Sequence, residues 1–339
     1  MSKPTLTVVI PAYNSQAHIR TTVDALVAAV SQSPFETDAV LVDDGSTDGT
    51  ADAAVAACAD RLRLRVIAQP NRGRFEARRA GLEVATGQWV LLLDSRVTLE
   101  ASSLAFAAER LDQGERVWNG HVHVHADGNL CATFWRLLAE LAWPDYFDEP
   151  RSTSFGAADF DRYPKGTTCF LAPRDTLLTA VSAFRSQYAD LRLANDDTPL
   201  IRSIAKRERI FLSPRFACDY SPRTSFGSFL RHSYHRGIVF LDGHGRRESR
   251  LFPAVIAFFP VSAAISVAAL RRPIATAAFG LAAVGMTAAG LGITKRRTPF
   301  EVAALASLAP IYAAAHGAGM WRGLMIRGRA GRRPRLSAT

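Results

Sequence analysis

Two uncharged stretches near the C-terminus constrain the fold of this chain more than any other feature. Residues 251–270 and 273–294 contain no Asp, Glu, Lys or Arg, and a basic cluster follows each. A helix of about 20 residues crosses the hydrocarbon core of a bilayer, so we expect two membrane-spanning helices. Residues 298–321 are also apolar but include Glu301 and Pro310. We expect this third stretch to span the membrane, to re-enter it or to lie at its surface.

The net charge of +10 comes from the C-terminal third of the chain. Residues 246–339 carry 14 Lys and Arg against 2 Asp and Glu, whereas residues 1–245 carry 27 against 29. Basic residues that flank apolar stretches are typical of contact with anionic lipid and not of nucleic-acid binding. We therefore predict a soluble domain over 1–245, a membrane segment of two or three helices over 246–325, and a basic tail over 326–339.

The cysteines and the N-terminus indicate a reducing compartment. Four cysteines stand far apart without a CxxC pair, which favours small buried residues over a disulfide framework or a zinc site. The N-terminal apolar run, residues 5–10, is too short for the hydrophobic region of a secretory signal. We expect a multi-pass protein of the inner (cytoplasmic) membrane whose soluble domain faces the cytoplasm.

The first 70 residues alternate between β-rich runs and stretches with helical spacing. This alternation predicts a doubly wound α/β domain, in which ligands bind at the carboxyl ends of the strands. We expect strands at 6–10, 39–42 and 63–68, and helices at 17–30 and 50–59.

Polar motifs follow the first two expected strands. Pro11-Ala12-Tyr13-Asn14 comes after the first strand, and Asp43 and Asp44 come after the second. Neither a GxGxxG motif nor a Walker A lysine loop is present, so a nicotinamide or flavin dinucleotide is not supported. Carboxylates at a strand end can instead accept hydrogen bonds from a base and a ribose, although turn and cap chemistry is the better explanation when such residues stand alone.

Three further segments follow in order: Gln69-Pro70-Asn71-Arg72-Gly73, then residues 77–82, then residues 85–94, which end in an apolar run and Asp94. With these segments in register, residues 5–97 resemble the family 2 glycosyltransferases. That family moves a sugar from a nucleotide diphosphate to an acceptor. The resemblance implies a GT-A Rossmann-like doubly wound mixed sheet, followed here by C-terminal transmembrane helices.

The resemblance also implies a nucleotide-sugar site. One of Asp43 and Asp44 is expected to read the base, and the choice between them stays open. Arg79 stands where the family has Asn, and it either adds a phosphate contact or is a solvated helix residue. The residues implied at this site are Pro11, Ala12, Tyr13, Asn14, Asp43, Asp44, Asn71, Arg78, Asp94 and Arg96.

The triplet Asp94-Ser95-Arg96 departs from the family's DxD motif. The last carboxylate of that motif normally holds Mg²⁺ or Mn²⁺, and a guanidinium cannot ligate a metal because it has no lone pair to offer. Two interpretations remain open: Arg96 pairs with the diphosphate in place of the ion, or Asp94 holds a divalent metal with other ligands.

The second half of the domain supplies the expected catalytic base. Residues 166–171 resemble the acceptor-side strand of the family, and Asn195-Asp196-Asp197 falls where the family has its acidic base motif. An inverting transfer needs a carboxylate to take the acceptor proton. The resemblance assigns this role to Asp197, with Asp196 as the alternative.

Residues 231–236 form a basic segment just before the first membrane stretch. Helical spacing places Arg231 and His235 on one face, where they would contact a diphosphate, a lipid phosphate or lipid headgroups. The QxxRW motif of processive family members is absent, so we expect the addition of a single sugar.

Together these features predict an inverting glycosyltransferase of cell-envelope glycan synthesis. Its partners would be a nucleotide-sugar donor, membrane lipids and a lipid-linked or membrane-proximal acceptor, but not nucleic acid. Two alternatives remain. One is a tethered transferase with a soluble acceptor, and the other is a catalytically inactive GT-A module that serves as a nucleotide-binding or assembly subunit.

Overall fold

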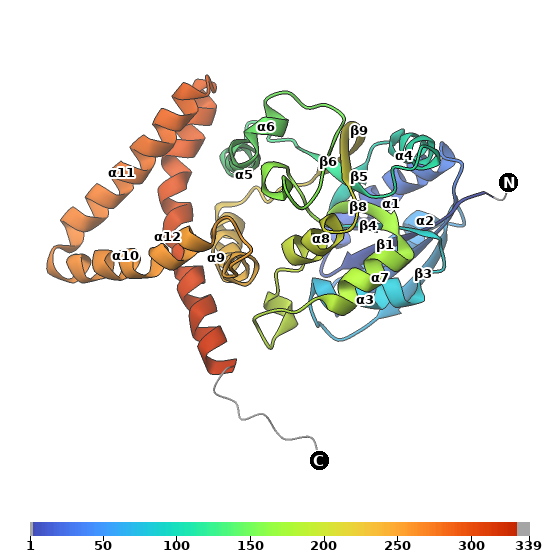
Figure 1. Cartoon of the computed structure of the whole chain (residues 1–339), viewed down its shortest axis with the longest axis horizontal. Coiled ribbons are helices and arrows are strands. Elements are labelled where there is room, and N and C mark those ends of the chain that lie inside the picture. The colour runs from blue at the N-terminus through green and yellow to red at the C-terminus, as the bar shows by residue number, and fades with distance from the viewer. Residues whose placement is uncertain (1–2, 331–339) are drawn as a thin grey trace, which may run out of the picture. The chain divides into compact units, whose positions relative to one another are not determined.

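The computed structural model describes residues 3–330 and divides them into two compact units. The first unit comprises residues 3–124, 143–185 and 196–221. The second comprises residues 125–142, 186–195 and 222–330. Figure 1 labels the helices and strands of both units.

A mixed sheet forms the centre of the first unit. Its nine strands, counted over residues 3–330, lie in the order β3-β2-β1-β4-β8-β6-β9-β5, and β7 also pairs with β9. Strands β1 to β4 are parallel, whereas β8 runs antiparallel to β4 and to β6. The strands are β1 (Thr5–Ala12), β2 (Glu36–Asp43), β3 (Arg63–Ala68), β4 (Trp89–Leu93), β5 (Val97–Leu99), β6 (Trp118–Val124), β7 (Thr153–Phe155), β8 (Cys169–Pro173) and β9 (Ile210–Tyr220).

Helices cover both faces of this sheet. Every residue of β4 is buried, as expected for a central strand with both faces covered. Val8 of β1 belongs to the same core as α1, whereas the next residue, Val9, faces α3. The helices of this unit are α1 (Gln16–Ser31), α2 (Thr50–Cys58), α3 (Arg74–Val84), α4 (Ser103–Asp112), α6 (Pro144–Phe147), α7 (Arg174–Ala183) and α8 (Asp197–Ala205), with a 3₁₀ turn at Phe160–Arg162.

A glycine lets α3 lie close to the sheet. A Cβ on Gly81 would stand only 2.4 Å from Val9 Cγ1, so a larger residue would force α3 away from β1. The close packing holds α3 against β1 and β2 at Val9 and Val42.

The architecture confirms the fold predicted from the sequence. The expected strands and helices of the first 70 residues all form, and their ends differ by a few residues at most from the predicted ones. The sheet is mixed because β8 enters beside β4 in the opposite direction. This is the doubly wound GT-A type of sheet.

Helices make up most of the second unit. They are α5 (Leu130–Ala142), α9 (Phe226–His244), α10 (Phe252–Arg271), α11 (Pro273–Thr294) and α12 (Pro299–Ala330), with a 3₁₀ turn at Leu191–Leu193. Phe134 and Leu137 of α5, Phe229 of α9 and Leu305 of α12 share one apolar core. Helix α12 therefore joins α5 and α9 in a single packed body.

Three helices among residues 3–330 are long and apolar enough to cross a membrane: Phe252–Arg271, Pro273–Thr294 and Pro299–Gly328. The third apolar stretch, for which several arrangements were open, is one continuous helix that contains Pro310. Of the predicted basic tail over 326–339, residues 331–339 lie outside the described residues.

The backbones of α9 and α12 come into contact where the two helices cross, and each helix has a glycine at this point. A Cβ on Gly237 would lie 2.0 Å from the carbonyl oxygen of His316, and a Cβ on Gly319 would lie 2.0 Å from that of Tyr234. No side chain fits between the two backbones at this point. Only glycine at both positions allows the helices to meet there.

Candidate active site

The carboxyl ends of the parallel strands bring the predicted nucleotide-binding segments together. Ala12 pairs in register with Asp43, and Asp43 pairs with Ala68, so the loops that follow these strands leave the same edge of the sheet. Asn14 ties two of these loops together, because its side-chain oxygen accepts a hydrogen bond from Thr47 N at 2.8 Å. This residue has a φ of 47°, a left-handed conformation that Asn tolerates better than most residues.

Asp43 and Asp44 differ sharply in their surroundings. Asp44 is buried, and its two oxygens accept hydrogen bonds from Gln69 Nε2 at 2.7 Å, Arg72 N at 2.8 Å and Gly73 N at 2.8 Å. Asp43 is half-buried at the strand end, where Oδ1 accepts a hydrogen bond from Ser46 N at 2.9 Å. Asp44 therefore anchors the 69–73 loop, and Asp43 is the more accessible carboxylate.

The other residues predicted to bind the nucleotide-sugar donor at this edge differ in their exposure to solvent. Pro11 and Ala12 are buried at the end of β1, whereas Tyr13 is 51% exposed just beyond it. Asn71 is exposed in the loop that Asp44 anchors. The edge therefore presents an aromatic ring and an amide to solvent above a buried strand end.

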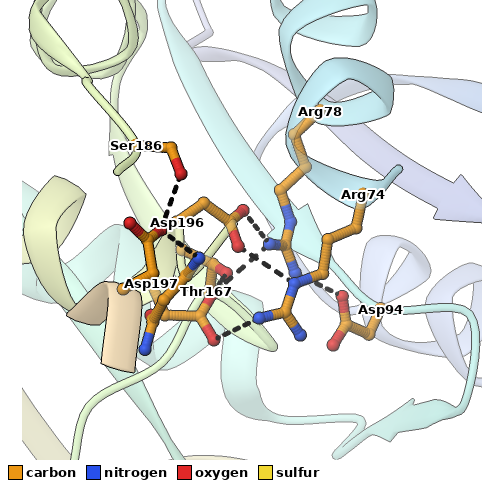
Figure 2. Close-up of polar contacts among 9 residues, drawn as sticks. Arg74, Arg78, Asp94, Thr167, Ser186, Asp196 and Asp197 are labelled. Carbon is orange, nitrogen blue, oxygen red and sulfur yellow. Dashed lines mark hydrogen bonds and ion pairs between the residues drawn. The ribbon is translucent and has the colours of Figure 1, made fainter. Parts of the chain in front are cut away.

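Arg78 lies at the centre of a charged cluster (Figure 2). It is 2% exposed on α3, and Nη2 donates to Asp94 Oδ1 at 2.7 Å. Nη1 donates to Asp196 Oδ2 at 2.5 Å and to Asp197 Oδ1 at 3.3 Å. One buried guanidinium thus links the end of β4 to the start of α8.

Asp196 and Asp197 occupy different positions within the cluster. Asp196 is fully buried and also accepts a hydrogen bond from Arg74 Nε at 2.9 Å. The Asp197 side chain is 27% exposed and accepts a hydrogen bond from Thr167 Oγ1. Thr167 is in reach because β8, which begins two residues later, pairs with β4. Asp197 is thus the member of the pair that a substrate can reach.

Electrostatics keep Asp197 ionised. Burial raises the pKa of Asp197, but Arg74, Arg78 and the hydrogen bond from Thr167 outweigh burial and lower the pKa to about 2. Burial lowers the pKa of Arg78, but the three carboxylates outweigh it and raise that pKa above its ordinary value. Asp197, Arg74 and Arg78 therefore carry their charges at neutral pH.

The altered triplet lies at the edge of this cluster. Ser95 is buried and its Oγ lies 2.8 Å from Ser15 Oγ, which holds the turn against the start of α1. Asp94 already pairs with Arg78, and Arg96 is half-buried. Over residues 3–330, no three His, Cys, Asp or Glu side chains lie where they could hold a metal ion together.

Two other arginines of α3 have clear positions. Arg79 is exposed and pairs with Glu76 at 2.5 Å and Glu83 at 3.8 Å on its own helix, which supports the interpretation of a solvated helix residue. Arg74 escaped the sequence analysis, although it precedes Arg78 by one helical turn, the spacing that puts two side chains on one face. Its position four residues before Arg78 was the signal in the sequence that could have identified Arg74 as a site residue.

Arg231 and His235 belong to α9 in the second unit. Arg231 is exposed, with Nη2 3.4 Å from Ser228 Oγ, and His235 is half-buried one turn further along. Their predicted contact with phosphate or headgroups stays a prediction.

The mixed sheet, with charged residues gathered at the carboxyl ends of its parallel strands, is of the GT-A type. The model of the family described as glycosyl transferase family 2 matches residues 7–160.

Curated relatives match part of the chain. The chain is 27% identical over 160 residues to a chondroitin synthase of Pasteurella multocida (46% of this chain, 16% of that protein). It is 42% identical over 110 residues to the succinoglycan biosynthesis protein ExoO of Rhizobium meliloti (32% and 30%). It is 29% identical over 112 residues to a dodecaprenyl-phosphate galacturonate synthase of Rhizobium johnstonii (32% and 33%). The chain thus spans a third or less of these relatives.

Solved structures share the fold. Residues 1–349 of TarS from S. aureus, in complex with UDP, superpose with a TM-score of 0.52 at 17% identity, covering 99% of this chain and 94% of that one. The mannosyltransferase PcManGT of Pyrobaculum calidifontis, in complex with GDP-Man and Mn²⁺, gives 0.54 at 19%, covering 95% and 88%.

Proposed function

We propose that this protein is an inverting, non-processive glycosyltransferase that moves a sugar from a nucleotide-diphosphate donor to a lipid-linked or membrane-proximal acceptor in cell-envelope glycan synthesis. The observation that carries the proposal is the bridge from Asp94 through Arg78 to Asp196 and Asp197. The Arg78 guanidinium contacts the Asp94 carboxylate on one side and the carboxylates of Asp196 and Asp197 on the other, and Asp197 is partly exposed. A sugar held at the first carboxylate would therefore meet a base at the second.

The donor would lie along the carboxyl edge of β1, β2 and β4. Asp43 is the better candidate for reading the base, because Asp44 is buried and holds the 69–73 loop. Tyr13 is exposed and offers a ring face to the base. The UDP and GDP-Man bound in the two solved structures support a nucleotide donor. The proposed donor site comprises Pro11, Ala12, Tyr13, Asn14, Asp43, Asn71, Arg78, Asp94 and Arg96.

Asp197 would act as the general base. As the acceptor oxygen forms its bond to the anomeric carbon, Asp197 takes the acceptor proton, and the bond from that carbon to the diphosphate oxygen breaks on the opposite face. The nucleoside diphosphate leaves with the bonding electrons, so the configuration inverts. Asp196 would position its neighbour, because both of its oxygens are committed to arginines.

Arg96 would balance the charge of the diphosphate, since the triplet offers a guanidinium where a metal-binding carboxylate is usual. Arg96→Ala should lower donor affinity, while EDTA should change it little. The opposite pair of results would make Arg96 a bystander and assign the charge to a divalent ion held by Asp94 with other ligands. Arg79→Ala is the matched control, because Arg79 pairs with acids of its own helix.

The acceptor would lie near the bilayer. Three membrane-length helices and the match to a dodecaprenyl-phosphate galacturonate synthase support a membrane-bound acceptor. Arg231 and His235 of α9 would contact its phosphate or the surrounding headgroups. We place the protein in the inner membrane with residues 1–245 on the cytoplasmic side and residues 246–325 as the anchor.

Donor binding is tested on the full chain purified in detergent. Thermal shift with UDP-, GDP-, CDP- and dTDP-sugars, each with Mn²⁺ or with EDTA, identifies the base and the metal requirement, because a bound ligand raises the apparent stability. A stabilising donor supports the site, and a flat response to all four classes of donor contradicts it.

Transfer is tested with that donor and a polyprenyl phosphate in vesicles. Asp197→Asn should abolish transfer, while the variant still binds the donor at least as tightly as the unaltered chain and keeps its thermal stability. Asp24→Asn, a surface carboxylate paired with Arg61 on the far side of the domain's core, is the control. Donor binding without transfer to any acceptor would favour the inactive nucleotide-binding subunit instead.

A further inference from the structure

Arg74 is the exposed arginine of the charged cluster. It is the first residue of α3, and its side chain is 46% exposed, against 3% for Arg78 one turn later. Arg74 Nε donates to Asp196 Oδ1 at 2.9 Å, and Nη2 lies 3.6 Å from Asp197 Oδ2. Arg74 therefore contacts both members of the acid pair (Figure 2), and nearly half of its side chain is exposed.

The cluster carries an excess of negative charge. Asp94, Asp196 and Asp197 contribute three carboxylates, and Arg74 and Arg78 contribute two guanidiniums. A nucleoside diphosphate that approached this cluster would be repelled unless a cation turned toward it. Arg78 is buried and engaged with all three carboxylates, so it orders the donor site but cannot turn toward the diphosphate. Within the cluster, Arg74 is the cation that can add to the charge proposed for Arg96. Arg74 is exposed, and only one of its two contacts with the carboxylates is a close hydrogen bond.

An inverting transfer puts the diphosphate within reach of Arg74. The base must lie about 2.6–3.2 Å from the acceptor oxygen, which in turn lies about 3–3.5 Å from the anomeric carbon. The leaving phosphate is bonded to that carbon through one oxygen. A long side chain that already touches the base can therefore swing to the phosphate without moving its helix.

We infer that Arg74 is shared between Asp197 and the donor: it pairs with the acid pair before the donor binds and turns to the diphosphate when the donor arrives. The inference rests on the proposed function and adds a donor-dependent switch to it. A diphosphate competes well for this residue because phosphate oxygens accept two parallel hydrogen bonds from a guanidinium. Donor binding then leaves Asp197 with fewer cationic neighbours at the moment its basicity is needed.

The charge state of the acid pair agrees with this exchange. Burial acts to raise the pKa of Asp197, and Arg74 is the largest single influence that lowers it. A carboxylate held at so low a pKa is a poor proton acceptor, because efficient bases have pKa values nearer the working pH. Withdrawing Arg74 while Arg78 and Thr167 stay in place raises the pKa of Asp197 in the direction that favours catalysis.

A double-mutant cycle on ligand binding tests the exchange. The probe is whichever of UDP, GDP, CDP and dTDP the unaltered full chain binds most tightly in detergent, measured by titration calorimetry. Arg74→Gln should weaken binding roughly tenfold or more, the loss of a charged hydrogen bond to phosphate. Asp197→Asn should tighten binding about tenfold in the chain with Arg74, because one of the two carboxylates that compete for the guanidinium is gone and only Asp196 remains. Together with Arg74→Gln the same change should tighten binding less than about threefold.

The controls separate the exchange from simpler effects. Arg79→Gln removes an equally exposed charge from the same helix and should leave binding unchanged. Arg74→Lys keeps the charge without the forked geometry and should give intermediate affinity, which distinguishes a lost contact from a misfolded chain. Equal gains from Asp197→Asn in both backgrounds would mean simple repulsion and would overturn this inference alone. If the unaltered chain binds none of the four diphosphates, the proposed donor site is wrong and this inference falls with it.

Discussion

Arg78 Nη1 lies 2.5 Å from Asp196 Oδ2, and both side chains are buried. The two residues are separated by 118 positions in the chain, so the pair fastens the start of α8 to α3. Breaking a buried ion pair by removing one partner leaves an uncompensated charge. This pair should therefore dominate the electrostatic stability of the first unit.

We predict that Arg78→Met destabilises the protein by about 3–5 kcal/mol. Asp196 would keep Arg74, but Asp94 would lose its described ion-pair partner. Chemical unfolding in detergent, followed by tryptophan fluorescence, measures the change. Arg79→Met should stay within about 0.5 kcal/mol of the unaltered protein, since that arginine is exposed. Similar losses of stability in both variants would show that the buried cluster contributes no more to stability than an exposed arginine does.

Substitutions of the two carboxylates at the end of β2 should affect different properties: one should lower the stability of the protein, and the other should weaken nucleotide binding. Asp44→Asn should cost about 1–3 kcal/mol, because an amide cannot accept all three hydrogen bonds that reach Asp44. Asp43→Asn should leave the melting temperature nearly unchanged and weaken nucleotide binding. Thermal melts and calorimetric titrations of both variants measure these effects. Reversed results would assign base reading to Asp44.

A buried histidine should make stability fall in mild acid. Burial, and to a lesser extent the neighbouring His123, lower the pKa of His121 to about 4, and its Nδ1 lies 2.7 Å from the Tyr146 hydroxyl. Because the unfolded chain takes up this proton near pH 6.5, the stabilising effect is complete above that pH and is lost progressively down to about pH 4.

Melting temperatures of the unaltered chain and of His121→Gln between pH 7 and pH 4 measure this effect. The variant should show the weaker dependence on pH. Parallel curves for the two proteins would remove His121 from this role.

A methyl group added where α9 and α12 cross should lower the stability of the protein. Gly319→Ala would place Cβ against the Tyr234 carbonyl and should cost about 1–3 kcal/mol or displace the helix. Gly280→Ala in α11 has nothing within 4 Å of the new carbon and should be neutral or slightly stabilising. Thermal melts of the two variants give the comparison, and equal melting temperatures would contradict the crossing.

Local sequence patterns predicted most of the fold. The alternation of β-rich runs and helical spacing up to residue 68 depends on neighbours within each element, and those elements form as expected. The uncharged stretches also became helices, because in such stretches length and hydropathy decide the structure.

The site was less predictable because its contacts join distant segments. Motif order pointed to Asp94, Asp196 and Asp197 separately, but only the fold reveals that one arginine holds all three. The difference between Asp43 and Asp44 likewise depends on a loop 25 residues or more away, whose backbone and amide groups occupy one carboxylate and not the other. Adjacent identical residues in a motif carry no local signal that separates them.

The glycine crossing of α9 and α12 has a consequence for handling the protein outside a membrane. Association of apolar helices through side chains changes with the surrounding solvent, whereas contact between two backbones depends on shape and van der Waals packing. Tyr234 and His316 present their carbonyls to glycine at this contact. Extraction into detergent should therefore leave α9 attached to α12, and the purified chain should keep this helix pair without any lipid.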